Sequence, residues 1–281
     1  MATNHEPAAA GSTAPAVDPK DASTVILVRD GQSGELEVFL LRRVAGMAFA
    51  GGMTVFPGGG VDPSDEDANI GWSGPPVSWW ARRFSTDAAR AKALVCAAVR
   101  ETFEECGVLL AGPTADSVVA DTARYARART RLEQRELSFG EFLESERLVL
   151  RTDLLRPWAN WITPVGEGRR YDTRFFVAAA PDGQVADGAT SEAEEVRWQT
   201  PAAAIAHWRD GASVLLPPTW TQLSRLAGFG TVAEVLAAEP DIPQILPTLV
   251  GEGKGLRVEF PDQEEYYAAR PHPWSKRSGD V

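Results

Sequence analysis

The chain has 281 residues, 44 % of them hydrophobic, which is enough to bury a sizeable core in one large domain or two small ones. Its formal net charge of -11 argues against a general nucleic-acid binder, because phosphate contacts need a basic surface. No stretch approaches the roughly twenty apolar residues of a transmembrane helix, so we expect no membrane-spanning segment.

Residues 1–22 are rich in Ala, Pro, Ser and Thr and lack the basic start and apolar core of a signal peptide. We therefore expect a disordered tail over 1–22 and a single folded domain over 23–281. The two cysteines, Cys96 and Cys106, lie on one predicted helix about 15 Å apart, too far for a disulfide. This cysteine usage predicts a reducing, cytoplasmic location.

The amino-terminal part of the chain predicts a hairpin followed by a glycine-rich approach. A β-branched run over 24–29 and a second run over 36–43 are separated by a turn at Asp30-Gly31, which favours an antiparallel pair with a five-residue connection. Residues 46–56 are punctuated by glycine and end in a short strand over 53–56. Pro57-Gly58-Gly59-Gly60 follows directly.

Two stretches interrupt the pattern of strands and core helices. Residues 62–90 combine acids, a Gly-Pro-Pro loop and an aromatic cluster, and we interpret them as an inserted loop with a short helix whose aromatic side chains pack on the main body. Residues 113–150 predict an α-helical elaboration, with a helix over 114–131 and a capping box from Ser138 to Glu141. We interpret its arginines as a salt-bridged surface rather than a binding patch: Arg124, Arg127, Arg129, Arg131 and Arg135.

Strand character returns in the second half of the chain. Strands are predicted over 158–163, 171–179 and 195–198, a helix from 201 to 209, two more helices over 219–226 and 232–238, and a last strand over 256–260. This order of elements predicts an α/β or α+β protein with a mixed sheet.

One helix, predicted over 91–107, carries two opposite faces. Glu101, Glu104 and Glu105 fall on the same side of it, where their charges repel one another. The opposite side is a buried stripe made of Val95, Cys96, Val99, Thr102, Phe103 and Cys106. Gly107 would end the helix as a left-handed cap. The acid face is either a solvated charged surface or the binding site of a cation.

The glycines upstream of this helix favour the cation. Glycines at 58–60 let backbone carbonyl groups approach a metal or a diphosphate closely, because no Cβ atom intervenes. Three carboxylates and a carbonyl are the hard oxygen ligands that Mg²⁺ or Mn²⁺ prefers. A metal in that position would neutralise a diphosphate and activate a water, so the combination predicts metal-assisted hydrolysis of a phosphoanhydride.

The residues of the acid helix carry a family resemblance. The run Arg100-Glu101-Thr102-Phe103-Glu104-Glu105-Cys106-Gly107-Val108 resembles the second half of the Nudix box, with Thr102 where an aliphatic residue is usual. Gly59 resembles the box glycine, but 41 positions separate it from Arg100 where the box has fourteen, so about 27 residues are inserted between the halves. Asp65 holds the nominal place of the first box glutamate, and Glu66 or no residue remains an alternative.

The interrupted box resembles the peroxisomal coenzyme A diphosphatase group of animals and its bacterial relatives. The upstream segment is similar to the coenzyme A motif of that group, with Arg43, Gly52 and the Phe56-Pro57-Gly58-Gly59 run in register. Leu41, Val44 and Ala48 depart from it, the last where a second arginine is usual.

The resemblance implies a Nudix α/β/α sandwich with a mixed sheet and assigns roles to individual residues. Gly59, Glu101, Glu104 and Glu105 would bind Mg²⁺ or Mn²⁺. Arg100 would hold and orient one of the glutamates. The general base is expected in the stretch 192–196, with Glu195 as the choice and one of the box glutamates as the alternative. The expected catalytic set is thus Glu104, Glu105, Arg100 and Glu195, and the expected substrate-binding residues are Arg43, Gly52, Phe56, Arg170 and Arg174.

The implied activity is that of a Nudix hydrolase, which cleaves a phosphoanhydride in a nucleoside diphosphate-linked small molecule, with coenzyme A or acyl-CoA as first choice. ADP-ribose, NADH or a dinucleoside polyphosphate is the alternative substrate. An inactive ligand-binding module with the same fold, or a helical interaction protein built on residues 113–150, is the alternative class. No nucleic-acid or membrane partner is expected, and a homodimer is left open.

Overall fold

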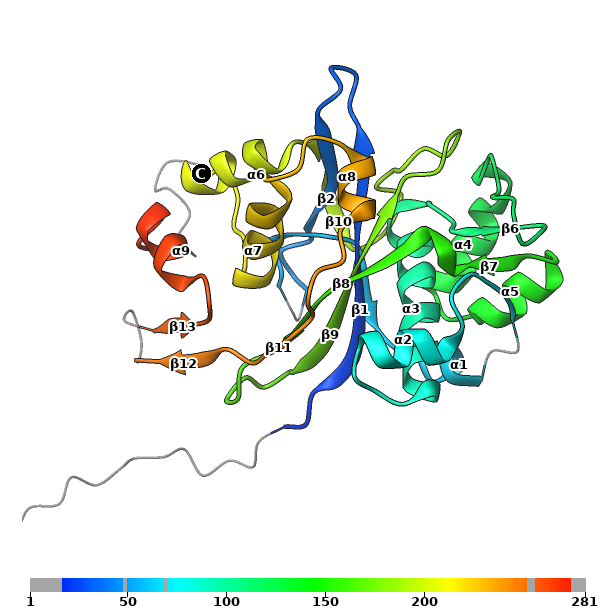
Figure 1. Ribbon diagram of the computed structural model, residues 1–281, viewed down its shortest axis with the longest axis horizontal. Helices are drawn as coiled ribbons and strands as arrows, with labels where there is room; N and C mark the ends of the chain where they lie inside the picture. Colours follow the sequence, from blue (N-terminus) through cyan, green and yellow to red (C-terminus); the bar gives the residue numbers. More distant parts are fainter. Residues whose placement is uncertain (1–16, 48–49, 68–69, 252–255, 274–281) are drawn as a thin grey trace, which may run out of the picture.

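A mixed β-sheet runs through the middle of the molecule, with helices on both of its faces (Figure 1). The computed structural model describes residues 17–47, 50–67, 70–251 and 256–273. Within them the main sheet has eight strands in the order β10-β2-β1-β9-β8-β11, with β3 paired to β2 and β4 paired to β1. The β1–β9 and β8–β11 pairs are parallel and the others antiparallel. The expected α/β sandwich with a mixed sheet is confirmed.

The strands of the main sheet are β1 (Lys20–Asp30), β2 (Leu36–Arg43), β3 (Thr54–Val55), β4 (Gly58–Gly60), β8 (Leu155–Ile162), β9 (Tyr171–Ala179), β10 (Ala193–Gln199) and β11 (Gln244–Ile245). Two small sheets contain β5 (Gly71–Ser73), β6 (Ala111–Gly112) and β7 (Val149–Arg151), and β12 (Thr248–Val250) and β13 (Arg257–Glu259). The helices are α1 (Pro63–Asp67), α2 (Val77–Arg83), α3 (Ala88–Cys106), α4 (Ala126–Glu133), α5 (Phe139–Ser145), α6 (Pro201–Arg209), α7 (Pro217–Leu226), α8 (Val232–Ala237) and α9 (Gln263–Ala269). None of the described helices is long and apolar enough to cross a bilayer.

Strand β1 explains why the sheet has two cores. Val25 and Leu27 point to the side covered by α2 and α3, whereas Ile26 and Val28 point to the side covered by α6, α7, α8 and α9. All four side chains are fully buried. Because both faces of the sheet are covered, the sequence of this strand is a continuous apolar run rather than an alternation of apolar and polar residues.

Several boundaries differ from the predicted ones. Lys20 to Ala22 belong to β1, so the expectation of a disordered tail over 1–22 is wrong at its end; residues 1–16 lie outside the described part. The helix predicted over 114–131 begins only at Ala126, after a short 3₁₀ turn at Ala123–Tyr125. The hairpin of β1 and β2, the capping box at Ser138 and the strand at 171–179 are confirmed.

The insert between the two halves of the box is folded against both the core and the helical elaboration. Trp80 and Phe84 are buried, and their rings lie 5.6 Å and 5.1 Å from that of Phe176 on β9. Strand β5 of the insert pairs with β7, which also pairs with β6. The insert therefore contributes two short helices and a strand, where a loop with one short helix was expected.

Candidate active site

Helix α3 supports the site, and its ends are fixed by local sequence. The side chain of Asp87 accepts a hydrogen bond from the Arg90 amide at 2.9 Å and caps the amino terminus. Gly107 stands in the left-handed region at φ 73° and donates its amide to the carbonyl of Phe103 at 3.0 Å. The apolar face predicted for this helix is buried against the sheet, which directs Glu101 and Glu104 away from the core.

The glycine strand β4 meets the acid face of α3 directly. A Cβ atom placed on Gly59 would lie 2.6 Å from both carboxylate oxygens of Glu101, so any side chain there would displace that carboxylate. One residue earlier, the Gly58 amide donates to Oε2 of Glu105 at 2.7 Å. The fold thus brings together the two halves of the motif across the long insert.

Arg100 is the hub of the acid cluster and is itself 7 % exposed. It binds Asp65 through Nε at 3.0 Å and Nη2 at 2.9 Å, and it donates to Glu101 at 2.8 Å and Glu104 at 3.3 Å. Nη2 also reaches the Gly60 carbonyl at 2.8 Å. The nominal position of the first box acid is therefore occupied by a residue that fixes Arg100, and Arg100 in turn orients two glutamates.

The carboxylates are only partly compensated by this arginine. Burial raises the pKa of Glu104 to about 7, against the opposing charge of Arg100. Burial likewise raises the pKa of Glu101, although Arg100 opposes it. For Glu105, burial and the charge of Glu101 raise the pKa well above its ordinary value, and Arg43 only moderates the effect. The cluster holds more negative charge than the protein around it neutralises.

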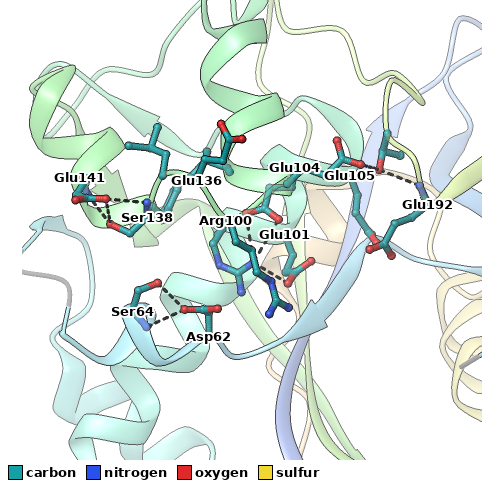
Figure 2. Close-up of a pocket in the computed structure, with 16 residues that line it drawn as sticks. Asp62, Ser64, Arg100, Glu101, Glu104, Glu105, Glu136, Ser138, Glu141 and Glu192 are labelled. Carbon is teal, nitrogen blue, oxygen red and sulfur yellow. Dashed lines mark hydrogen bonds and ion pairs between the residues drawn. The ribbon is translucent and has the colours of Figure 1, made fainter. Parts of the chain in front are cut away.

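A cavity of about 410 Å³ opens over this cluster. Figure 2 shows Arg100, Glu101 and Glu104 at its centre, with Asp62 and Ser64 on one side and Glu192 on the other. Its other wall comes from the helical elaboration, with Leu132, Glu133, Arg135, Glu136, Leu137, Ser138, Phe139 and Glu141 among the lining residues. The elaboration is thus part of the site, which the expectation of a salt-bridged surface did not foresee.

The loop that carries Glu192 is attached to the helical elaboration. Asp187 donates its amide to the Cys106 carbonyl at 3.0 Å and accepts from Arg129 of α4 at 2.7 Å. Glu133 of α4 accepts from the amide and the hydroxyl of Ser191 at 2.7 Å and 2.6 Å. These contacts hold the loop at the carboxyl-terminal end of α3.

The structure does not bring the predicted general base to the cavity. Glu195 lies on β10 with its side chain 37 % exposed, paired to Arg197 and 3.6 Å from Arg42. Glu192, from the same acidic stretch, lines the cavity instead and forms an ion pair with Arg43. The strand begins at Ala193, so Glu192 is the last loop residue; nothing in the pattern of this acidic run shows where the loop ends and the strand begins.

The residues predicted to bind substrate do not line this cavity. Phe56 is 3 % exposed in the core on the opposite face of the sheet, and Gly52 forms a turn at φ 73°. Arg170 donates to the carbonyls of Thr163 and Val17, and Arg174 is buried and paired with Asp172. Only Arg43 approaches the site, through Glu192. The four others have structural contacts of their own.

The donor set suits a divalent cation. Glu101, Glu104, Glu105 and Glu192 offer hard oxygen atoms around one cavity, and their incomplete neutralisation is what a bound cation would relieve. Among the described residues, no three acidic, histidine or cysteine side chains already converge closely enough to hold a metal. Glu101 accepts a hydrogen bond from Arg100, and Glu105 accepts one from the Gly58 amide, each through one of its two carboxylate oxygens.

Comparisons with known proteins agree with this geometry. The chain is 24 % identical over 242 residues to the acyl-coenzyme A diphosphatase NUDT19 of Xenopus laevis, a match that covers 74 % of this chain and 64 % of that protein. It is 28 % identical over 279 residues to the NUDT19 protein of Gallus gallus, covering 83 % and 73 % respectively. A crystal structure of a Nudix hydrolase from Alicyclobacillus acidocaldarius shares the fold, with a TM-score of 0.66, 22 % identity, and coverage of 80 % of this chain and 99 % of that one.

The family model of the NUDT19 Nudix domain matches residues 81–226, just over half of the chain. That range contains α3 with its acid face, the helical elaboration and the loop that carries Glu192. The chain therefore belongs to the NUDT19 Nudix domain family and is a Nudix hydrolase.

Proposed function

We propose that this protein hydrolyses the diphosphate of coenzyme A or of acyl-CoA, releasing 3′,5′-ADP and a 4′-phosphopantetheine product. The observation that carries the proposal is the close contact between the Glu101 carboxylate and Gly59, beneath an acid-lined cavity of about 410 Å³. The choice of coenzyme A among diphosphates is supported by the similarity to two acyl-coenzyme A diphosphatases. Arg43 and Gly52, which match the coenzyme A motif, shape the neighbouring turn: the Gly52 amide donates to the Arg43 carbonyl at 3.0 Å.

We propose that Glu101, Glu104 and Glu105, with the Gly59 carbonyl, hold Mg²⁺ or Mn²⁺. When bound, such a cation supplies charge for the diphosphate and lowers the pKa of an attacking water. Arg100 keeps Glu101 and Glu104 on the cavity side through its bonds at 2.8 Å and 3.3 Å. Asp65 keeps Arg100 in that position through two of its nitrogens.

We propose Glu192 as the residue that accepts the proton of the attacking water. It is the carboxylate of the 192–196 stretch that lines the cavity, and its Arg43 partner holds it from the side of β2. The loop contacts of Glu133 and Asp187 fix the backbone on which it stands. Hydrolysis would then add water across the P–O–P bridge, so that each of the two products keeps one of the two phosphates.

The test is a hydrolysis assay with Mg²⁺ and with Mn²⁺ on coenzyme A, acetyl-CoA, NADH, ADP-ribose and a dinucleoside polyphosphate. We expect kcat/KM to be highest for coenzyme A or acetyl-CoA. Glu104→Gln should lower that value at least a hundredfold, because it removes one charge from the cation site. Mass spectrometry checks that the products from coenzyme A are 3′,5′-ADP and 4′-phosphopantetheine.

Glu144→Gln is the matched control, because Glu144 is an exposed glutamate on α5 that does not line the cavity. It should retain the activity of the unmodified protein. Hydrolysis that survives Glu104→Gln undiminished would show that the acid face does not hold the cation. Preferential cleavage of NADH or ADP-ribose would show that the substrate assignment is wrong, while the assignment of the active site would stand.

A further inference from the structure

The cavity wall is strongly acidic, and its two arginines differ in how far neighbouring groups already occupy them. Its lining includes eight acidic residues and two arginines, Arg100 and Arg135. Arg100 is fully engaged with Asp65, two glutamates and the Gly60 carbonyl. The side chain of Arg135 has no hydrogen bond or ion pair within the described residues. Arg135 is thus the cation of this wall that is available to a ligand.

The backbone holds Arg135 at the cavity in an unusual conformation. Arg135 follows the last residues of α4 at φ 59°, a region that non-glycine residues rarely adopt. Its amide donates to the Leu132 carbonyl at 2.8 Å, and the Glu136 amide donates to the Arg131 carbonyl at 2.8 Å, which completes a Schellman motif. Glycine is the usual residue at this position, so an exposed arginine here is a local departure from the most favourable choice.

The charge of Arg135 acts on the inside of the cavity. Asp62 is a neighbour on the opposite wall: burial tends to raise its pKa, but bonds from Ser64 and the charges of Arg100 and Arg135 lower it. Arg135 therefore faces the same space as the acid helix, although it belongs to the helical elaboration.

We propose that Arg135 binds a phosphate monoester of the substrate that is separate from the diphosphate to be cleaved. This assignment rests on the proposed function, in which a cation on the glutamates neutralises the diphosphate. A phosphate monoester brings a further charge of about −1.5 to −2, which eight acidic residues would repel unless a cation meets it. The planar guanidinium of arginine matches phosphate oxygens with two parallel bonds. In coenzyme A this group is the 3′-phosphate.

The chain contains a matched pair for the test. Arg147 also stands one position past the C-cap of a helix, at φ 54°, with its amide bonded to the Glu144 carbonyl and the next amide bonded to the Leu143 carbonyl. Arg147 does not line the cavity. Asparagine tolerates the left-handed region, so Arg135→Asn and Arg147→Asn remove the same charge from the same backbone motif without strain.

The first experiment measures binding by calorimetry, with 3′,5′-ADP and with 5′-AMP, which differ only by the 3′-phosphate. We expect the unmodified protein to bind 3′,5′-ADP at least tenfold more tightly than 5′-AMP. Arg135→Asn should abolish that preference, Arg135→Lys should restore part of it, and Arg147→Asn should retain it. Equal binding of the two nucleotides by the unmodified protein, or a preference that survives Arg135→Asn, would overturn the proposal.

The second experiment compares hydrolysis of coenzyme A with that of dephospho-coenzyme A, a pair that differs only by the 3′-phosphate. Arg135→Asn should lower kcat/KM at least tenfold more for the phosphorylated member of a pair, through KM rather than kcat. An equal loss on both members would show that Arg135 serves the diphosphate or the fold, and would overturn the assignment. If no coenzyme A is cleaved, the proposed function fails, while the nucleotide binding still decides the role of Arg135.

Discussion

At the scale of single residues, the three consecutive glycines of β4 differ in how much space surrounds them. A Cβ atom on Gly58 would lie 2.4 Å from the Ser23 carbonyl oxygen, one on Gly59 would lie 2.6 Å from the Glu101 carboxylate, and one on Gly60 would have 3.9 Å to its nearest neighbour. Gly58 is thus required by the pairing of β4 with β1, and Gly59 by the approach of the acid helix. Gly60 tolerates a side chain.

Gly59→Ala should therefore impair the site more than the fold. The added methyl group displaces the flexible end of Glu101, which moves a carboxylate of the cation site without opening the sheet. We expect kcat/KM to fall at least tenfold and the free energy of unfolding to change by about 1 kcal/mol or less. Steady-state kinetics and urea unfolding measure the two quantities.

Gly60→Ala is the control in the same strand and should leave both quantities nearly unchanged. Gly58→Ala should instead lower stability, because its obstacle is backbone rather than a movable side chain. If Gly59→Ala retained full activity, close contact between Gly59 and Glu101 would not matter for catalysis.

At the scale of elements, the helical elaboration is joined to the site by helix α4. Arg129 donates to the Glu104 carbonyl at 3.0 Å and to Asp187 at 2.7 Å, so it bridges the end of α3 and the following loop. Glu133 holds Ser191, the residue before Glu192. One helix thus lines the cavity and positions the loop that carries the proposed base.

Glu133→Ala should loosen this loop. It removes the acceptor of the Ser191 amide and hydroxyl, bonds of a kind worth about 1 kcal/mol each. We expect faster hydrogen exchange at the Ser191 amide and a severalfold lower kcat, because Glu192 would be held less firmly. Exchange followed by NMR and steady-state kinetics provide the measurements.

Glu146→Ala is the control for that change, because Glu146 is an exposed glutamate of the same elaboration whose ion pair, with Arg124, spans 3.9 Å. It should alter neither the exchange of Ser191 nor kcat. Unchanged exchange in Glu133→Ala would mean that other contacts, such as that of Arg129 with Asp187, suffice to hold the loop.

At the scale of the whole molecule, the buried carboxylates of the site destabilise the fold, and packing in the two apolar cores offsets this cost. The carboxylates of α3 are buried beside one another with raised pKa values, and this destabilises the fold whenever they are ionised. Packing on both faces of the sheet compensates for it: Trp80 is fully buried on one face, and Trp158 and Trp208 on the other. A bound cation would remove much of the cost.

This cost predicts a pH dependence of stability in the metal-free protein. Glu104 has a pKa of about 7 in the fold against an ordinary value of 4.5, so between these values the folded state binds more protons than the unfolded state. The contribution of this group to stability is therefore full below pH 4.5 and is lost as the pH rises toward 7. The metal-free melting temperature should fall between pH 5.5 and pH 8.

Mg²⁺ or Mn²⁺ should raise the melting temperature more at pH 8 than at pH 5.5, because protons compete with the cation for the same carboxylates. Differential scanning calorimetry with metal and with EDTA at both values measures the increment. Glu104→Gln should make the metal-induced rise in melting temperature less dependent on pH. An increment that is equal at the two pH values would contradict the raised pKa values of the cluster.

The contribution of the sequence was largest where structure is local. The period of α3 predicted its acid and buried faces, and Gly107 predicted its end, because helix geometry relates residues three and four apart. The motif also identified Arg100 and the glutamates, and the β-branched runs predicted β1, β2 and β9. The short strands β5, β6 and β7 escaped prediction, since their pairing is with one another across distant segments.

What only the tertiary structure decided are the contacts between distant segments. Asp65 meets Arg100 across 35 positions, and Arg43 meets Glu192 across 149. Local periodicity carries no information about such pairs, because their approach depends on how α3, β4 and the helical elaboration pack around the sheet. For the same reason Glu192 rather than Glu195 lines the cavity, and Arg135 faces the acid helix. The sequence alone determined the chemistry of the acid helix, and the packing decided which residues surround it.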